Sequence, residues 1–167
     1  MRLETLAMRF SEFVEPADHG VEASFPCIID RSTAKRREAG AEDHARVEHV
    51  LVIDDEVAVN NNVRKILKKK GYRVDQATSK AEALEKIDQR EYRLVLLDLK
   101  MPGVKGLELL EAIRTVQPQA RVIIITGYAS IETAVQTARM GAVDYVPKPF
   151  TPDEIRSATE SAICLAA

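Results

Sequence analysis

The chain has 167 residues, of which 46% are hydrophobic and 30% are charged, and its formal net charge is −2. That length allows one domain with a full core plus additional sequence, and the near-neutral charge excludes a general electrostatic attraction to nucleic acid. No apolar run approaches the roughly 20 residues that span a bilayer, no secretory signal opens the chain, and Cys27 and Cys164 form no metal or redox spacing, so we expect a cytoplasmic protein without membrane association.

Residues 1–48 carry weak signals of order and are interpreted as an N-terminal extension of unassigned function. Four apolar residues near its start recur at spacings of three and four, namely Leu3, Leu6, Phe10 and Phe13. That spacing is typical of a short amphipathic helix, either a frayed terminal helix (or a misassigned start codon) or a docking or dimerisation helix. Residues 31–48 are dense in charge and are expected to form a linker or a solvated segment.

Beyond this extension, apolar runs alternate with amphipathic segments. Residues 50–53 predict a buried strand, and residues 58–70 predict a helix with apolar residues on one face. A second, more alternating strand is predicted at residues 72–76. Ser79 is expected to cap the next helix, with Glu82 three residues later completing a capping box.

The second half of the chain continues the alternation. Strands are predicted at residues 94–97, 122–125 and 143–146, helices at 107–116 and 131–140, and a last helix capped by Thr151. Continuous apolar strands joined by helical crossovers predict a parallel sheet covered on both faces. Residues 49–167 are therefore expected to form one α/β domain with five strands.

Polar residues follow four of the predicted strands. Asp54 and Asp55 come directly after the first strand, and Asp98 comes after the third. Thr126 follows the fourth strand, and Lys148 follows the fifth. In an open α/β sheet the carboxyl ends of the strands form the ligand crevice, so these side chains are expected to meet in one pocket.

The three carboxylates would repel one another and raise their pKa values unless a cation neutralises them, and Mg²⁺ suits such oxygen ligands. An aspartate can also attack phosphorus and form an aspartyl phosphate. Asp98 is the best candidate for this role because its strand is central, which leaves Asp54 and Asp55 to hold the metal. Lys148 and the Thr126 hydroxyl would then contact oxygens of a transferring phosphoryl group.

Each of these residues also has a simpler interpretation. Asp54 or Asp55 could merely cap the following helix. Thr126 could be a turn residue, and Lys148 could be a solvated surface charge. The matching position of Asp98 weighs against helix capping as the whole explanation.

Three longer strings carry a resemblance to a known family. They are Val52-Ile53-Asp54-Asp55-Glu56, Asp98-Leu99-Lys100-Met101-Pro102-Gly103 and Asp144-Tyr145-Val146-Pro147-Lys148-Pro149-Phe150. Together with Thr126, this set resembles the receiver domain of two-component response regulators, over roughly residues 49–165. The stretch at residues 141–150 is similar to receivers of nitrogen-regulation-type transcriptional activators.

The resemblance implies a doubly wound, flavodoxin-like α/β fold whose five-stranded parallel sheet has the strand order 2-1-3-4-5. It implies Asp98 as the phosphoacceptor, with Mg²⁺ held by Asp55, Asp98 and the backbone carbonyl of Lys100, and with Asp54 assisting through water. It also implies that the protein is not an enzyme, beyond assisting its own phosphorylation and dephosphorylation. A bulky Tyr128, two residues after a site residue, would shield the phosphoryl group from water.

The resemblance further implies a sensor histidine kinase or a histidine phosphotransfer protein as the phosphoryl donor. Thr126 and Tyr145 would form the switch, which changes the face built by the fourth helix, the fifth strand and the fifth helix. A downstream effector protein, or a phosphorylation-dependent homodimer, would read that face. His19, His44 and His49 all lie at or before the first strand, so the phosphohistidine would come from another molecule.

Other classes of protein compete with this interpretation. A phosphatase that forms an aspartyl phosphate normally has Asp-x-Asp after its first strand, whereas here the pair is adjacent. A flavodoxin-like cofactor binder needs a phosphate loop there, and the acidic residues 54–56 would repel a phosphate. A fragment of a longer transcriptional regulator and a phosphorylation-independent interaction module both stay open. Nothing resembles a helix-turn-helix or a P-loop, so direct nucleic-acid binding by this chain is not expected.

Overall fold

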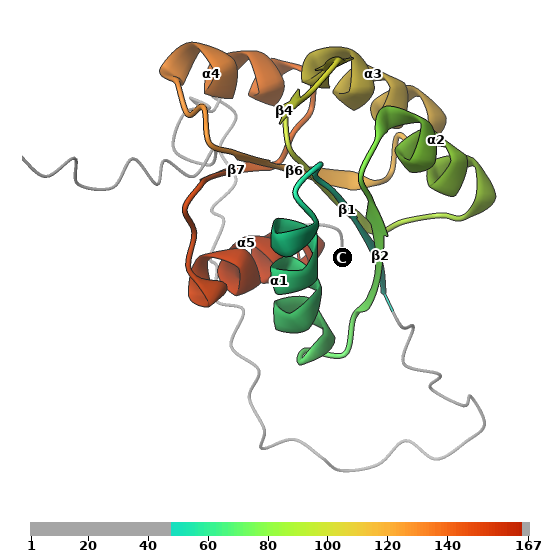
Figure 1. Cartoon of the computed structure of the whole chain (residues 1–167), viewed down its shortest axis with the longest axis vertical. Coiled ribbons are helices and arrows are strands. Elements are labelled where there is room, and N and C mark those ends of the chain that lie inside the picture. The colour runs from blue at the N-terminus through green and yellow to red at the C-terminus, as the bar shows by residue number, and fades with distance from the viewer. Residues whose placement is uncertain (1–47, 165–167) are drawn as a thin grey trace, which may run out of the picture.

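The computed structural model describes residues 48–164 (Figure 1). The expected amphipathic helix at residues 3–13, nearly all of the charged segment 31–48, and Cys27, His19 and His44 lie outside the described residues. Within residues 48–164, no helix combines the length and the apolar character needed to cross a membrane.

Five parallel strands form the main sheet. They are β1 (His49–Ile53), β2 (Arg73–Ala77), β3 (Leu94–Leu97), β6 (Arg121–Thr126) and β7 (Asp144–Pro147). Their order across the sheet is β2-β1-β3-β6-β7, which confirms the expected 2-1-3-4-5 arrangement when these strands alone are counted. Ile53 lies beside Leu97, and Leu97 lies beside Ile124, so the carboxyl ends of the three central strands stand at nearly the same level.

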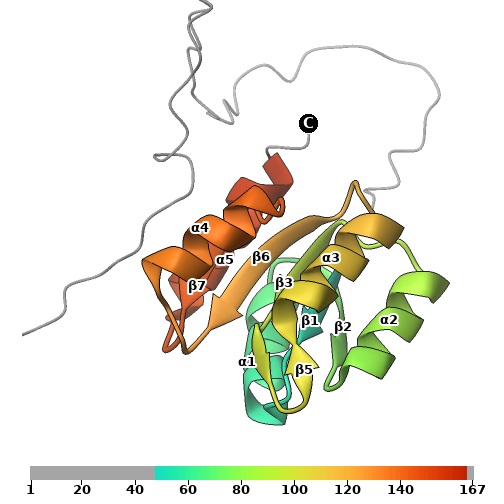
Figure 2. The same ribbon diagram turned by 90° about the horizontal axis from the view of Figure 1, so that it is seen from above.

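Helices cover both faces of this sheet (Figures 1 and 2). One face is covered by α1 (Val57–Lys68) and α5 (Pro152–Cys164), and the other by α2 (Lys80–Gln89), α3 (Gly106–Val116) and α4 (Ile131–Arg139). Alternate residues of each strand therefore enter two separate cores. Every residue of β3 is completely buried, which explains why its sequence is a continuous apolar run.

Side-chain caps fix where α2, α4 and α5 begin, and the caps of α2 and α5 were predicted from the sequence. The Glu82 amide donates to the Ser79 hydroxyl at 3.2 Å, while the Glu82 carboxylate accepts from the Thr78 amide instead of the Ser79 amide. Before α5, the Thr151 amide donates to the Glu154 carboxylate at 2.6 Å and the Glu154 amide donates back to the Thr151 hydroxyl at 3.3 Å. Both predicted caps are thus confirmed. The Ser79 cap differs from a standard capping box, because the Glu82 carboxylate accepts from the amide of the residue before Ser79.

The structure also contains a hairpin that the sequence analysis did not predict. Its two strands, β4 (Lys100–Met101) and β5 (Val104–Lys105), are antiparallel and too short to show a side-chain period. Pro102 and Gly103 form the turn, and Gly103 has a φ of 69°, a conformation that glycine adopts without strain. The hairpin connects the end of β3 to α3 and lies beside the carboxyl edge of the main sheet.

The first helix is shorter than predicted. It ends at Lys68 instead of residue 70, because the chain turns at Gly71, whose φ is 89°. The Gly71 amide donates to the Lys68 carbonyl, and the Tyr72 amide donates back to the Leu67 carbonyl. These two bonds satisfy carbonyls at the helix end and direct the chain into β2.

Candidate phosphoacceptor and metal site

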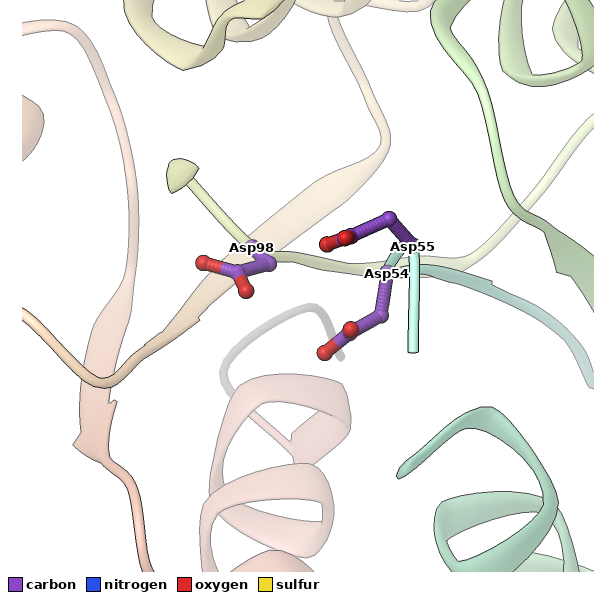
Figure 3. Close-up of side chains that lie close together, drawn as sticks. All are labelled: Asp54, Asp55 and Asp98. Atoms are coloured by element: carbon purple, nitrogen blue, oxygen red, sulfur yellow. The ribbon is translucent and has the colours of Figure 1, made fainter. Parts of the chain in front are cut away.

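Three carboxylates converge at the carboxyl edge of the sheet (Figure 3). Asp54 and Asp55 follow β1, and Asp98 follows the neighbouring strand β3. The Asp98 amide donates to the Ile53 carbonyl at 2.9 Å, which continues the strand pairing up to the acidic residues. One ligand atom from each carboxylate lies within 4.8 Å of the other two. Strand register therefore brings the three predicted acidic residues together.

Asp54 is the most enclosed of the three, with only 2% of its surface exposed. One carboxylate oxygen accepts from the Glu56 amide at 2.9 Å, and the other lies 2.6 Å from the Lys148 ammonium. Burial raises the pKa of the Asp54 carboxyl, and the hydrogen bond from Lys148 offsets only part of that effect. The site therefore holds a carboxylate whose charge is costly unless a cation lies nearby.

Lys148 supplies one such positive charge from the end of β7. Its Nζ lies 2.8 Å from Asp98 Oδ2, and the same atom also contacts the Asp54 carboxylate. Burial by itself lowers the pKa of Lys148, but the hydrogen bonds to both aspartates and the negative charges of these aspartates together outweigh burial, so the net pKa is raised. The Lys148 amide donates to the Thr126 carbonyl at 2.8 Å, and the Lys148–Pro149 peptide bond is cis. Lys148 is thus held as an ammonium between two of the three carboxylates.

Asp98 is held on both sides of its carboxylate. Oδ1 accepts from the Lys100 amide at 2.9 Å, while Oδ2 binds the Lys148 ammonium. Only 4% of the Asp98 surface is exposed. The Lys100 side chain points elsewhere, because its ammonium lies over the ring of Tyr128. The Asp98 carboxylate is therefore oriented by a backbone amide from the β4 hairpin and by a cation from β7.

Thr126 and Tyr145 lie on β6 and β7, the two strands beyond β3 in the sheet. Thr126 is the last residue of β6 and is 1% exposed, and its hydroxyl accepts from the Tyr128 amide at 3.3 Å. The Tyr145 ring is also buried, and its hydroxyl donates to the Tyr128 carbonyl at 3.2 Å. Burial raises the pKa of Tyr145, with a smaller opposing effect from the backbone at Ser130. In this structure the Tyr145 ring already occupies an inward position.

The donor set fits a hard divalent cation. All three side chains offer carboxylate oxygen, and one ammonium leaves the cluster with an excess of negative charge. Mg²⁺ is bound in proteins through one or two carboxylates and retains several waters, so it does not require a complete cage of side chains. Asp55 is half-buried at the edge of the cluster and can meet a partly hydrated ion.

Two residues that shape the site were missed by sequence reasoning. Gly106 begins α3, and a Cβ atom there would lie 2.7 Å from the Leu99 carbonyl carbon and closer still to the Leu99 Cα and oxygen. Asn60 is 1% exposed, and its amide donates to the Asp54 and Ala77 carbonyls. A sequence signal existed for Asn60, because it lies three residues before Val63 on the apolar face of α1.

The fold and the site define a class of protein: a flavodoxin-like α/β domain with an acidic, cation-compatible site at the carboxyl edge of its sheet. Residues 50–160 match the family model described as the response regulator receiver domain. The chain belongs to this family, and it is a receiver domain of the two-component response regulator type. This finding decides against the phosphatase and the flavodoxin-like cofactor binder.

Relatives of different lengths share this domain. The sporulation initiation phosphotransferase F of Bacillus subtilis is 34% identical over 113 residues, covering 68% of this chain and 91% of that protein. The transcriptional regulatory protein ZraR of Klebsiella oxytoca is 36% identical over 114 residues, covering 68% of this chain but only 26% of ZraR. The match thus spans nearly all of the sporulation protein and about a quarter of ZraR.

A solved structure adds chemical information about a similar protein. A response regulator protein from Burkholderia pseudomallei, with a phosphorylated aspartic acid, calcium ion and citrate, shows 35% sequence identity to this chain. The similarity has a TM-score of 0.63 and covers 71% of this chain and 73% of that one.

Proposed function

We propose that this chain accepts a phosphoryl group on Asp98 from a phosphohistidine of a sensor histidine kinase or a histidine phosphotransfer protein. The observation that carries the proposal is the position of Asp98. Its Oδ2 lies 2.8 Å from the Lys148 ammonium, and its carboxylate shares an acidic cluster with Asp54 and Asp55. The solved relative with a phosphorylated aspartic acid and a calcium ion supports the same chemistry.

In the proposed reaction an Asp98 carboxylate oxygen forms a bond to phosphorus while the bond from phosphorus to the donor histidine nitrogen breaks. The nitrogen keeps the electron pair of the broken bond and takes up a proton. Lys148 would balance negative charge on the phosphoryl oxygens, and the Thr126 hydroxyl would donate to one of them. Asp54, Asp55, Asp98 and the Lys100 carbonyl are the proposed holders of Mg²⁺, which when bound would neutralise further negative charge.

We propose that the phosphorylated state is read on the face formed by α4, β7 and α5. A phosphoryl group would draw in the Thr126 hydroxyl and stabilise the inward position of the Tyr145 ring. The packing of α4 supports this role, since Thr137 is its one fully buried residue and Ile131 at its start is 62% exposed. A weakly buried helix can shift at low cost, which suits an element that an effector protein or a second copy would recognise.

The remaining parts of the proposal rest on the sequence and on the lengths of the relatives. We propose residues 1–48 as an extension distinct from the receiver domain, a cytoplasmic location, and no catalysis beyond the chain's own phosphorylation and dephosphorylation. A receiver that acts through protein contacts would resemble the short relative, and a fragment of a longer regulator would resemble part of ZraR, so both alternatives stay open.

The test is the intact mass of the full chain after incubation with Mg²⁺ and acetyl phosphate, for wild type, Asp98→Asn and Asp88→Asn. Asp88 is an exposed aspartate on α2 and serves as the matched control. We expect one phosphoryl adduct in wild type and in Asp88→Asn, and no adduct in Asp98→Asn. Folded wild-type protein without an adduct would contradict the proposal and favour the phosphorylation-independent interaction module.

A further inference from the structure

Asn60 is a buried polar residue on the apolar face of α1. Its side-chain amide donates two hydrogen bonds, to the Asp54 carbonyl at 2.7 Å and to the Ala77 carbonyl at 3.3 Å. Its side-chain oxygen receives no hydrogen bond from the described residues. A buried polar group with an unsatisfied oxygen costs free energy, so fold stability alone does not explain an asparagine at this position.

The two carbonyls that Asn60 binds lie at the ends of neighbouring strands. The Asp54 amide already donates to the Ala77 carbonyl at 3.1 Å, as the last bond between the ends of β1 and β2. Asn60 adds a further link from α1 to both strands, beyond the point where their regular pairing ends. The first turn of α1, the end of β1 and the end of β2 are thereby fixed to one another.

The Asp54 carbonyl belongs to the peptide bond that joins Asp54 to Asp55. That bond is planar, so holding its oxygen also fixes the direction in which the Asp55 backbone leaves. Because the two carboxylates are adjacent and both lie near Asp98, their mutual repulsion favours a loop in which they separate. The Asn60 amide opposes that separation through the backbone, without touching a carboxylate.

We propose that Asn60 is a positioning residue, whose amide holds the Asp54–Asp55 peptide so that both carboxylates converge with Asp98 on a divalent cation. This inference rests on the proposed function, since it assumes that the cluster binds a cation. Loss of the Asn60 amide should weaken the affinity of the site for the cation. It should leave the reactivity of Asp98 unchanged once the cation is bound. Substitutions of residues that orient metal ligands without contacting the metal typically weaken metal affinity 10–100-fold. We therefore expect about a tenfold loss of cation affinity here.

The test compares Asn60→Leu and Asn60→Val with the control Asn62→Leu in the full chain. Both Asn60 variants keep a side chain of similar size, and neither offers the amide donor. Asn62 is the exposed asparagine two positions along the same helix. Affinity for Mn²⁺ alone is measured from the electron paramagnetic resonance signal of the free ion, and thermal unfolding checks that each variant is folded. Asn60→Ala replaces any variant that fails to fold.

A second readout is the initial rate of phosphoryl uptake from acetyl phosphate as the Mg²⁺ concentration is varied. We expect about a tenfold weaker Mn²⁺ affinity and a tenfold higher half-saturating Mg²⁺ concentration in the Asn60 variants, with the rate at saturating Mg²⁺ retained. Asn62→Leu should match wild type in both readouts.

Three outcomes would overturn the inference. Unchanged Mn²⁺ affinity in folded Asn60 variants contradicts it while leaving the proposed function intact. A reduced rate at every Mg²⁺ concentration, without a shift in half-saturation, indicates a purely structural role for Asn60. Wild type that neither binds Mn²⁺ nor takes up a phosphoryl group contradicts the proposed function, and the inference fails with it.

Discussion

The ammonium of Lys100 lies 2.9 Å from the centroid of the Tyr128 ring, so a residue from the hairpin after β3 contacts a residue from the loop after β6. Lys100 comes two residues after Asp98, and Tyr128 comes two residues after Thr126. Lys100, Thr126 and Tyr128 line one groove, together with Leu99, the residue that directly follows Asp98. The contact therefore links two loops that flank the proposed phosphoryl position.

Replacing Tyr128 by alanine should shorten the lifetime of the phosphorylated protein, because the ring and its contact with Lys100 would no longer restrict water. An exposed cation–π contact is worth about 0.5–1 kcal/mol, so the half-life should fall about two- to fivefold. The measurement is the loss of the adduct by intact mass after removal of the donor. Tyr128→Phe keeps the ring and should retain the wild-type half-life, whereas equal half-lives for Tyr128→Ala and wild type would contradict the shielding role.

Replacing Lys148 by methionine should make stability depend on the metal. Without the ammonium, Asp54 and Asp98 lose the cation that lies between them, and removing one partner of a buried ion pair costs about 3 kcal/mol. Mg²⁺ would then raise the melting temperature of the variant more than that of wild type. Thermal unfolding with and without Mg²⁺ measures this difference, and Lys65→Met tests the loss of an exposed lysine. An equal response to Mg²⁺ in all three proteins would argue against Lys148 as a neutralising cation.

Glu82 should contribute stability that disappears in acid. The hydrogen bond from the Thr78 amide, followed by the bond from Lys86, lowers the pKa of Glu82 below its ordinary value of 4.5. Because the pKa is lower in the folded than in the unfolded state, the Glu82 carboxylate stabilises the fold at pH values above its ordinary pKa. This contribution is lost as the pH falls through the folded-state pKa. Glu82→Gln should therefore be less stable than wild type by about 0.5 kcal/mol at neutral pH, with the difference vanishing in acid. Urea unfolding at neutral and at acidic pH measures the difference in the free energy of unfolding between the two proteins. A difference that grows in acid would contradict the lowered pKa of Glu82.

Gly106→Ala should destabilise the fold and disturb the site together. The new methyl group would overlap the backbone of Leu99, which directly follows Asp98, and rigid overlap with backbone costs about 3 kcal/mol. We expect a lower urea midpoint and slower phosphoryl uptake. Gly127→Ala is the control, because nothing lies within 4 Å of a Cβ atom built there. A Gly106→Ala variant as stable as wild type would show that the hairpin shifts easily.

Much of this architecture could be predicted from sequence because it depends on local patterns. The apolar run at residues 94–97 predicts a buried strand, and the polar residues after each strand share an edge whenever the strands are parallel. The hairpin could not be predicted this way, since a two-residue strand shows no alternation. The contact of Asn60 with Ala77 depends on how α1 sits against β2, and the inward position of Tyr145 depends on the loop at Tyr128, so both are set by tertiary packing.

The site draws its side chains from the ends of four different strands: Asp54 after β1, Asp98 after β3, Thr126 at the end of β6 and Lys148 after β7. Each pairing in the series β1, β3, β6 and β7 must be formed, and in register, before these groups can meet. A molecule in which any one of these strands has detached has an incomplete site. The capacity to accept a phosphoryl group therefore reports whether the sheet is intact. Along a denaturant titration, this capacity should decline together with the unfolding of the whole sheet and not with the fraying of one edge strand.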